Sequence, residues 1–196
     1  MIRIITITRE FGSGGRTVAR ETAEKLGWDY YDYNLISKIA SESGYAESFI
    51  EQFGEESEGG WFSGMTANAF SLSDNLFLAQ RKVILELAEK GNCVIVGRCA
   101  DYILEERDDV FNAFVCADEQ WKKNRIQNIY RQREEAVDKA FRQKNKRRAA
   151  YYKYYTGQNW GQAWNYDLCL KTSSLGIEES ADLLARTVLE LNERED

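Results

Sequence analysis

The sequence predicts one α/β domain in which a five-stranded parallel sheet lies between two layers of helices. Apolar, β-branched runs of strand length alternate with segments of helical periodicity, which is typical of strands joined by crossover helices. The first such run leads directly into glycines that open a helix. With 196 residues and 43% hydrophobic residues, the chain is long enough for one core but short for two. We therefore expect a single domain over 1–196.

Five strand candidates follow one another along the chain. The first, 2–8, contains four isoleucines and predicts a strand that is buried on both faces. The others are an aromatic run over 28–32, an apolar run over 93–97, and the segments 110–117 and 166–171. Helical spacing predicts the connections, in segments 18–26, 35–40, 77–90, 121–129 and 177–191, with a basic helical region before the last strand. The acidic, glycine-rich segment 51–63 predicts a mobile loop.

Composition excludes several kinds of chemistry. The chain has no histidine, which removes Ser-His and Cys-His nucleophiles and most zinc sites. Its four cysteines never occur as CxxC, so we interpret them as buried thiols. Phosphoryl transfer remains, because it depends mainly on positioning and positive charge. No apolar run is long enough to span a bilayer and no export signal is recognisable, so we expect a cytoplasmic protein with no membrane partner.

The segment EFGSGGRT, between the first strand and its helix, is the strongest functional signal. Missing side chains allow backbone N–H groups to converge on an anion, and the helix adds the positive end of its dipole. The alternative is an ordinary glycine turn, because Glu10 replaces the first glycine of the usual phosphate loop. The predicted phosphate-binding residues are Gly12, Ser13, Gly14, Gly15, Arg16 and Thr17.

Two of these residues carry specific expectations. Arg16 stands where phosphate loops usually have lysine. Its planar guanidinium can donate two parallel N–H bonds to phosphate oxygens, whereas the ammonium of lysine acts as a point charge. The hydroxyl of Thr17 stands where Mg²⁺ is usually held, so Thr17 is the predicted metal ligand.

Further candidates follow the second and third strands, because ligands of parallel sheets bind at the carboxyl ends of the strands. Asp32 can orient a hydroxyl or amino group of an acceptor or assist a metal, or it can cap a helix. Arg98 can bind a ligand or form a structural ion pair. Asp101 can cap the next helix or approach Mg²⁺.

Residues 120–153 contain twelve Lys or Arg and three Asp or Glu, a local charge of +9 in a chain of net charge −6. Lys146, Arg147 and Arg148 can close over the phosphates as a lid and neutralise the charge that develops during transfer. The tyrosines and Trp160 that follow can instead pack the structure together, or form a stacking platform for single-stranded nucleic acid. The acidic remainder of the chain disfavours a nucleic-acid partner.

Four motifs in order, ITREFGSGGRTVA, VIVGRCADYIL, RRAAYYKYYTGQNWG and YDLCLKTSSLGIE, resemble the cytidylate-kinase-like family of P-loop nucleoside monophosphate kinases. The resemblance covers nearly the whole chain. It implies the three-layer P-loop kinase fold, with a small acceptor-binding insertion over 33–75 and a helical lid over 131–160. It also implies transfer of the γ-phosphoryl group of ATP, with Mg²⁺, to a nucleoside monophosphate such as CMP or dCMP.

The resemblance also implies roles for individual residues. It assigns Arg16, Arg147 and Arg148 to catalysis, and Asp32, Arg98 and Asp101 to the acceptor. Two departures stand out, the arginine in the phosphate loop and Asn145, where related lids often have aspartate. They leave open a non-catalytic nucleotide- or anion-binding protein on the same fold, and the acceptor could be another small molecule.

Overall fold

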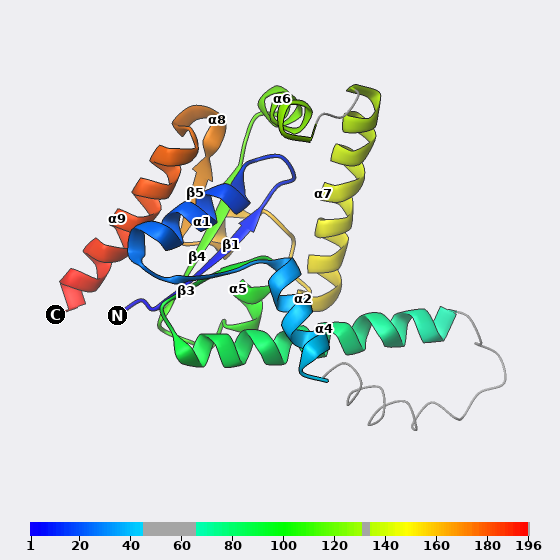
Figure 1. The fold of residues 1–196 in the computed structure, drawn as a ribbon, viewed down its shortest axis with the longest axis horizontal. Coiled ribbons are helices and arrows are strands. Elements are labelled where there is room, and N and C mark those ends of the chain that lie inside the picture. Colours follow the sequence, from blue (N-terminus) through cyan, green and yellow to red (C-terminus); the bar gives the residue numbers. More distant parts are fainter. Residues whose placement is uncertain (45–65, 131–133, 196) are drawn as a thin grey trace.

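A computed structural model of the protein describes residues 1–44, 66–130 and 134–195, and in them a five-stranded parallel sheet lies at the centre (Figure 1). The strand order is β2-β3-β1-β4-β5, with all neighbouring pairs parallel. The predicted α/β class and the five predicted strands are confirmed. The strands are β1 (Ile4–Arg9), β2 (Asp29–Tyr31), β3 (Cys93–Val96), β4 (Val110–Cys116) and β5 (Leu168–Lys171).

Helices connect the strands at nearly all the positions that the periodicity predicts. The long helix before β3 begins earlier than the predicted residue 77, and a separate four-residue helix, which ends before Gly176, precedes the final predicted helix. The predicted loop 51–63 lies outside the described residues. The helical elements are α1 (Gly15–Leu26), α2 (Tyr33–Glu42), α4 (Thr66–Lys90), α5 (Ala100–Ile103), α6 (Glu119–Tyr130), α7 (Glu134–Thr156), η2 (Ala163–Asn165), α8 (Thr172–Leu175) and α9 (Ile177–Glu195).

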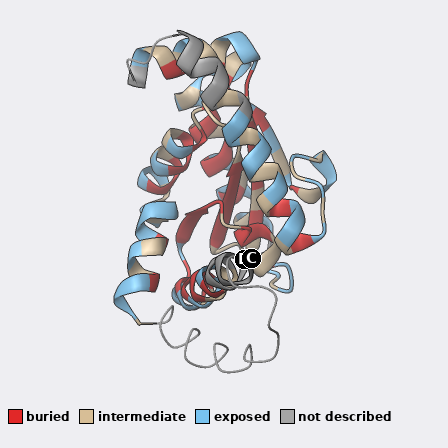
Figure 2. Cartoon of the chain, turned by 90° about the vertical axis from the view of Figure 1, so that its right-hand side faces the viewer, coloured by how far each residue is buried: buried red, intermediate tan, exposed pale blue. Residues whose placement is uncertain are grey.

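Successive residues of the inner strands face opposite helical layers. Ile5 and Ile7 of β1 lie in a cluster with α1 and α9, whereas Ile4 lies in a cluster with α2, α4 and α5. Both clusters are buried around the sheet, as Figure 2 shows. Because a parallel sheet is covered on both faces, the strands are apolar throughout instead of alternating. This packing fixes the carboxyl ends of β1 and β3 side by side.

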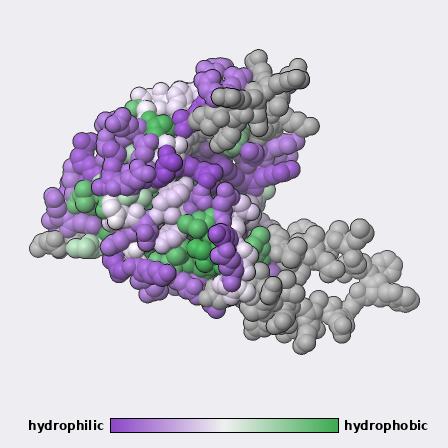
Figure 3. All heavy atoms as spheres, in the orientation of Figure 1, coloured by the Kyte–Doolittle hydropathy of each residue, from purple (hydrophilic) through white to green (hydrophobic). Residues whose placement is uncertain are grey.

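The surface and the cysteines differ in part from expectation. The face seen in Figure 1 is hydrophilic over most of its middle, with a smaller apolar patch lower down (Figure 3). Cys93 and Cys99 are buried as predicted, but Cys169 is exposed because it lies on β5, at the edge of the sheet. None of the described helices combines the length and apolar character that crossing a membrane requires.

The α9 side of the core provides a test of this packing. Leu184 is fully buried, so Leu184→Ala is expected to lower the free energy of unfolding by about 2–5 kcal/mol. On the same helix Leu189 is 51% exposed, and Leu189→Ala is expected to change it by less than about 0.5 kcal/mol. Urea unfolding of both variants measures the difference, and equal effects would contradict the placement of α9.

Candidate functional site

The loop between β1 and α1 has the backbone of a phosphate-binding turn. Gly12 (φ 84°) and Gly14 (φ 81°) adopt left-handed conformations that favour glycine, and α1 begins immediately afterwards at Gly15. Ser13 is fully buried, and its hydroxyl donates to the carbonyl of Glu10 over 2.9 Å, so this side chain fixes the turn. The loop therefore has the geometry on which the predicted phosphate site depends, with the first N–H groups of α1 at its centre.

Two polar groups of the loop have partners on other helices. The N–H of Phe11 donates to Oδ1 of Asn145, on α7, over 2.7 Å. The hydroxyl of Thr17 accepts a hydrogen bond from Nη2 of Arg125, on α6, over 3.0 Å. Asn145, the residue at which this chain departs from related lids, thus contacts the phosphate loop directly.

The predicted site residues Arg16 and Asp32 form an ion pair. Asp32 is also the N-cap of α2, where its Oδ1 accepts from the N–H groups of Asn34 and Leu35 at 3.0 and 3.1 Å. Burial opposes ionisation of this carboxyl, but the N–H of Leu35 and the charge of Arg16 outweigh it and lower the pKa of Asp32. The cap interpretation of Asp32 is therefore correct, and the same carboxylate holds the arginine of the phosphate loop.

Glu10, at the position of the missing first glycine, anchors the start of the loop. Its Oε2 lies 2.6 Å from Nζ of Lys122 and accepts from the N–H of Ala117 over 3.3 Å. The side chain of Lys122 is only 6% exposed, and loss of one partner from such a buried pair is strongly destabilising. The pair ties the loop to α6 and to the end of β4.

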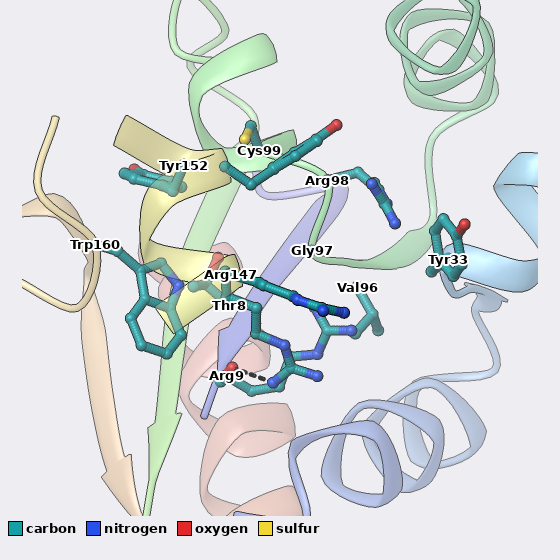
Figure 4. A pocket seen from close by; sticks show the side chains of 12 residues that line it. Thr8, Arg9, Tyr33, Val96, Gly97, Arg98, Cys99, Arg147, Tyr152 and Trp160 are labelled. Atoms are coloured by element: carbon teal, nitrogen blue, oxygen red, sulfur yellow. Dashed lines mark hydrogen bonds between the residues drawn. The ribbon is translucent and has the colours of Figure 1, made fainter. Parts of the chain in front are cut away.

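A cavity of about 290 Å³ lies beside the loop, at the carboxyl ends of β1 and β3 (Figure 4). Trp160 stands on one side of it and Tyr33 on the other. None of its described lining residues is acidic. A second space of about 690 Å³ lies over the glycine loop and shares the cavity's arginines, so these stand between the two spaces. The shared arginines are Arg9, Arg98, Arg147 and Arg148.

Arg98 is directed into the cavity by a strained turn after β3. Gly97, Arg98 and Cys99 all have positive φ, at 74°, 59° and 57°. For the two residues that are not glycine, this costs about 1–3 kcal/mol each. The guanidinium carbon of Arg98 lies 3.7 Å from the ring centroid of Tyr33 and 5.0 Å from that of Tyr151, within the range of cation–π attraction. Such strain at a cavity supports the predicted ligand-binding role of Arg98 over a structural ion pair.

Asp101 lines neither the cavity nor the space over the loop. It is in the first turn of α5, 6% exposed, whereas the N-cap position is Cys99, without a side-chain hydrogen bond. Its Oδ2 accepts from the hydroxyl of Tyr152, on α7, over 2.9 Å, and its Oδ1 has no partner within the described residues. Burial raises the pKa of Asp101 in spite of the bond from Tyr152. The structure thus places Asp101 neither at the helix cap nor at the phosphate loop, but between α5 and α7.

Helix α7 carries the predicted lid residues over the loop, beside which it runs in Figure 1. Arg147 and Arg148 line both spaces. Nη1 of Arg148 donates to the carbonyl of Arg9 over 2.8 Å, and Nζ of Lys144 lies 4.1 Å from the ring centroid of Phe11. The helix is therefore docked on the phosphate loop in this structure.

The aromatic residues after the basic run mostly pack inward. Tyr155 stacks on Phe77 of α4 with ring centroids 3.9 Å apart, and Trp160 lies edge-on to Phe114 at 5.6 Å. Tyr154 differs, with 59% of its surface exposed. These rings support the packing interpretation over a platform for nucleic acid.

Four residues of the site were missed from the sequence: Arg9, Tyr33, Arg125 and Lys144. Arg9 had a usable signal, because a charge that ends a buried strand is the same feature that identified Arg98. Tyr33 directly follows Asp32 and shares its position at a strand end. Arg125 and Lys144 belong to a segment with many cations, and spacing alone does not indicate which of them reach the loop.

The first strand of this parallel sheet ends in a glycine turn, and a helix that carries arginines lies over the turn. Together these features define a P-loop kinase fold. The sequence profile of the cytidylate kinase-like family matches residues 4–174, and the chain belongs to this family. Since kinases give this family its name, the chain is related to phosphotransferases.

Solved structures agree with this fold. An uncharacterised protein from Eubacterium ventriosum ATCC 27560 is 26% identical with a TM-score of 0.76, covering 96% of this chain and 98% of that chain. Shikimate kinase from Bacteroides thetaiotaomicron is 16% identical (TM-score 0.56, 96% and 99% covered). Shikimate kinase from Acinetobacter baumannii in complex with shikimate is 17% identical (TM-score 0.53, 97% and 94% covered). The two kinases show likeness of fold alone. None of the curated proteins compared with the chain matches it.

The Arg16–Asp32 pair predicts a pH-dependent stability. Asn can still accept the bonds that cap α2, so Asp32→Asn removes mainly the charge. Because the pKa of Asp32 is lowered by folding, its contribution is present above the unfolded value near pH 4 and is lost as the pH falls through the folded value. We expect Asp32→Asn to lower the free energy of unfolding by less than about 1 kcal/mol at pH 7, and by progressively less as the pH falls below about 4. Urea unfolding at neutral and acidic pH tests this, with Arg16→Gln as the matched control; a loss that stays undiminished at low pH contradicts it.

Asp101 predicts the opposite pH dependence. Its pKa is raised by folding, so the folded state is destabilised as the pH rises above the unfolded value near 4. Asp101→Asn keeps an acceptor for Tyr152, and we expect it to be more stable than the parent at pH 8, with the advantage shrinking toward pH 4. Tyr152→Phe removes the donor and is expected to lower stability by about 1–3 kcal/mol. Thermal melts across this range measure both variants, and an Asp101→Asn protein less stable at pH 8 rules the explanation out.

Proposed function

We propose that the protein is an ATP- and Mg²⁺-dependent kinase that transfers the γ-phosphoryl group to a small anionic acceptor. The observation that carries the proposal is the glycine turn at the end of β1, which lines a space that shares four arginines with the neighbouring cavity. Membership of a kinase-like family and the P-loop kinase fold support the same reaction class.

In the proposed reaction, the amides of the loop hold the phosphate tail of ATP, and Arg16 exchanges Asp32 for phosphate oxygens. Arg147 and Arg148, between the two spaces, neutralise the charge that spreads over the moving phosphoryl group. The acceptor oxygen lies in the smaller cavity beside Arg98 and attacks the γ-phosphorus in line, while the bond from that phosphorus to the β,γ-bridging oxygen breaks and ADP leaves with its electron pair. An anionic phosphate oxygen as nucleophile requires no general base.

Thr17 suits Mg²⁺ as a ligand. Its hydroxyl oxygen is a hard donor, and Mg²⁺ keeps several waters and takes phosphate oxygens, so one protein oxygen is enough. The hydroxyl accepts from Arg125, so metal binding and this hydrogen bond compete for the same oxygen. When bound, the ion would supply positive charge between the phosphates of ATP.

We propose a nucleoside monophosphate as the acceptor, with CMP and dCMP as the first candidates. The rings of Tyr33 and Trp160 provide apolar walls for a base or sugar, and Arg98 provides a cation for the phosphate. Helix α2 and the first part of α4 lie within the proposed acceptor-binding insertion over 33–75, of which 45–65 lie outside the described residues.

A second candidate is a nucleotide sensor on the same fold that transfers no phosphoryl group. It is favoured by one feature of the loop: the groups of Phe11, Arg16 and Thr17 that would meet ATP and its metal already have protein partners. A sensor could use the exchange of these partners as its response to nucleotide.

Turnover separates the two candidates. We expect ADP release from ATP and Mg²⁺ with at least one member of a panel of nucleoside monophosphates, measured in a coupled assay. Arg98→Ala is expected to lower this turnover about 100-fold, the effect of losing a charged contact, while leaving affinity for an ATP analogue unchanged. Arg20→Ala, on the exposed side of α1, is the matched control and should behave as the parent. Binding of the analogue without turnover on any acceptor would favour the sensor.

A further inference from the structure

Arg9 occupies a space that two glycines leave open at the carboxyl end of β1. A β-carbon at Gly15 would lie 2.5 Å from Cβ of Arg9, and one at Gly97 would collide with its Nη1. These glycines follow different strands, β1 and β3, and approach the arginine from two directions. A larger residue at either position would displace Arg9, so the edge of the sheet is shaped to hold it.

The guanidinium of Arg9 has no counter-ion in the described part of the chain. Its Nε is buried without an acceptor, and Arg9 forms no ion pair with a described residue. Burial and the charges of Arg148 and Arg98 lower the pKa of Arg9 to about 9, which leaves it charged at neutral pH. Arg9 as a whole is only partly buried and lines both spaces, where a ligand can supply the opposite charge to its guanidinium. The fold keeps Arg9 in this position although no described acidic residue forms an ion pair with it.

The geometry around Arg9 matches one kind of ligand. Figure 4 shows the side chains of Arg9 and Arg147 extending into the same cavity, with Arg98 above them. Guanidinium groups bind phosphate through pairs of parallel N–H bonds, and a phosphate monoester has three free oxygens for several such forks. A neutral hydroxyl compound or a single carboxylate would leave most of this positive charge uncompensated.

We infer that Arg9 binds the acceptor, and that the acceptor carries a phosphate monoester dianion held between Arg9, Arg98 and Arg147. The description of this ligand as the phosphoryl acceptor rests on the proposed kinase function. The binding of a phosphate dianion at Arg9 does not.

Binding and melting measurements test the inference without any turnover. The protein is first saturated with Mg²⁺ and a non-hydrolysable ATP analogue, so that the glycine loop is filled. Calorimetry then measures binding of inorganic phosphate and CMP, with cytidine as the matched ligand that lacks the phosphate and malonate as a dicarboxylate. We expect phosphate and CMP to bind, cytidine to bind far more weakly, and Arg9→Met to weaken phosphate and CMP about 10- to 100-fold.

The unliganded variants provide an independent readout. Because Arg9→Met removes a cation that Arg148 and Arg98 repel and keeps the apolar stem, its melting midpoint is expected to rise by roughly 2–8 °C. Arg9→Lys keeps the positive charge but loses the planar pair of N–H donors, so it should retain part of the phosphate affinity. It also replaces Arg9→Met as the test variant if Arg9→Met does not fold. Arg20→Met controls for loss of a surface arginine and should change neither binding nor midpoint.

Three results would overturn the inference. One is phosphate and CMP binding to Arg9→Met at the parent's affinity, and another is a lower midpoint for that variant with binding intact, which would make Arg9 structural. Arg9-dependent binding of malonate at least as tight as phosphate would overturn the phosphate assignment. A protein that binds phosphate through Arg9 but transfers no phosphoryl group would instead refute the proposed kinase function alone.

Discussion

The parallel pairing of β1 with β3 is the constraint on which the site depends. Their register, with Ile7 opposite Val96, brings the glycine turn after β1 beside the strained turn after β3. Arg9 and Arg98 therefore emerge at one edge of the sheet, although they are far apart in the sequence. The hydrophobic clusters on the two faces hold this edge rigid, since a shift of one residue would exchange the buried faces of both strands. Core packing thus positions Arg9 and Arg98, although neither belongs to the hydrophobic clusters.

Positively charged side chains predominate at this edge of the sheet. Acidic residues do approach the loop, but each of the described ones is already engaged: Glu10 with Lys122, and Asp32 with Arg16 and the cap of α2. None of the described residues that line the cavity with the arginines between the two spaces is acidic. This explains how an acidic protein of net charge −6 can present a strongly cationic site.

Sequence patterns predicted the sheet, its helices and the glycine turn because these follow from local periodicity and from the backbone freedom of glycine. They also identified Arg98, since its place after an apolar strand fixes where it lies. The contacts of α6 and α7 were beyond prediction, because a helix that is cationic over most of its surface does not show which side faces the loop. Asp101 was misplaced for a related reason: α5 begins one residue before it, so the side chain points to Tyr152 instead of capping the helix.

The docking of α7 links its position to the occupancy of the loop. Asn145 accepts from the N–H of Phe11, and Arg148 donates to the carbonyl of Arg9, so α7 uses backbone groups of the segment that leads into the glycine turn. A polyphosphate that claims that N–H must displace Asn145, while its charge attracts Arg147 and Arg148. Under the proposed function, nucleotide binding would therefore break one contact of the helix and strengthen others, and only the difference between them could shift the helix. An asparagine at this position makes the exchange easier than an aspartate would, because a neutral amide forms a weaker bond to the N–H and does not repel the incoming phosphate.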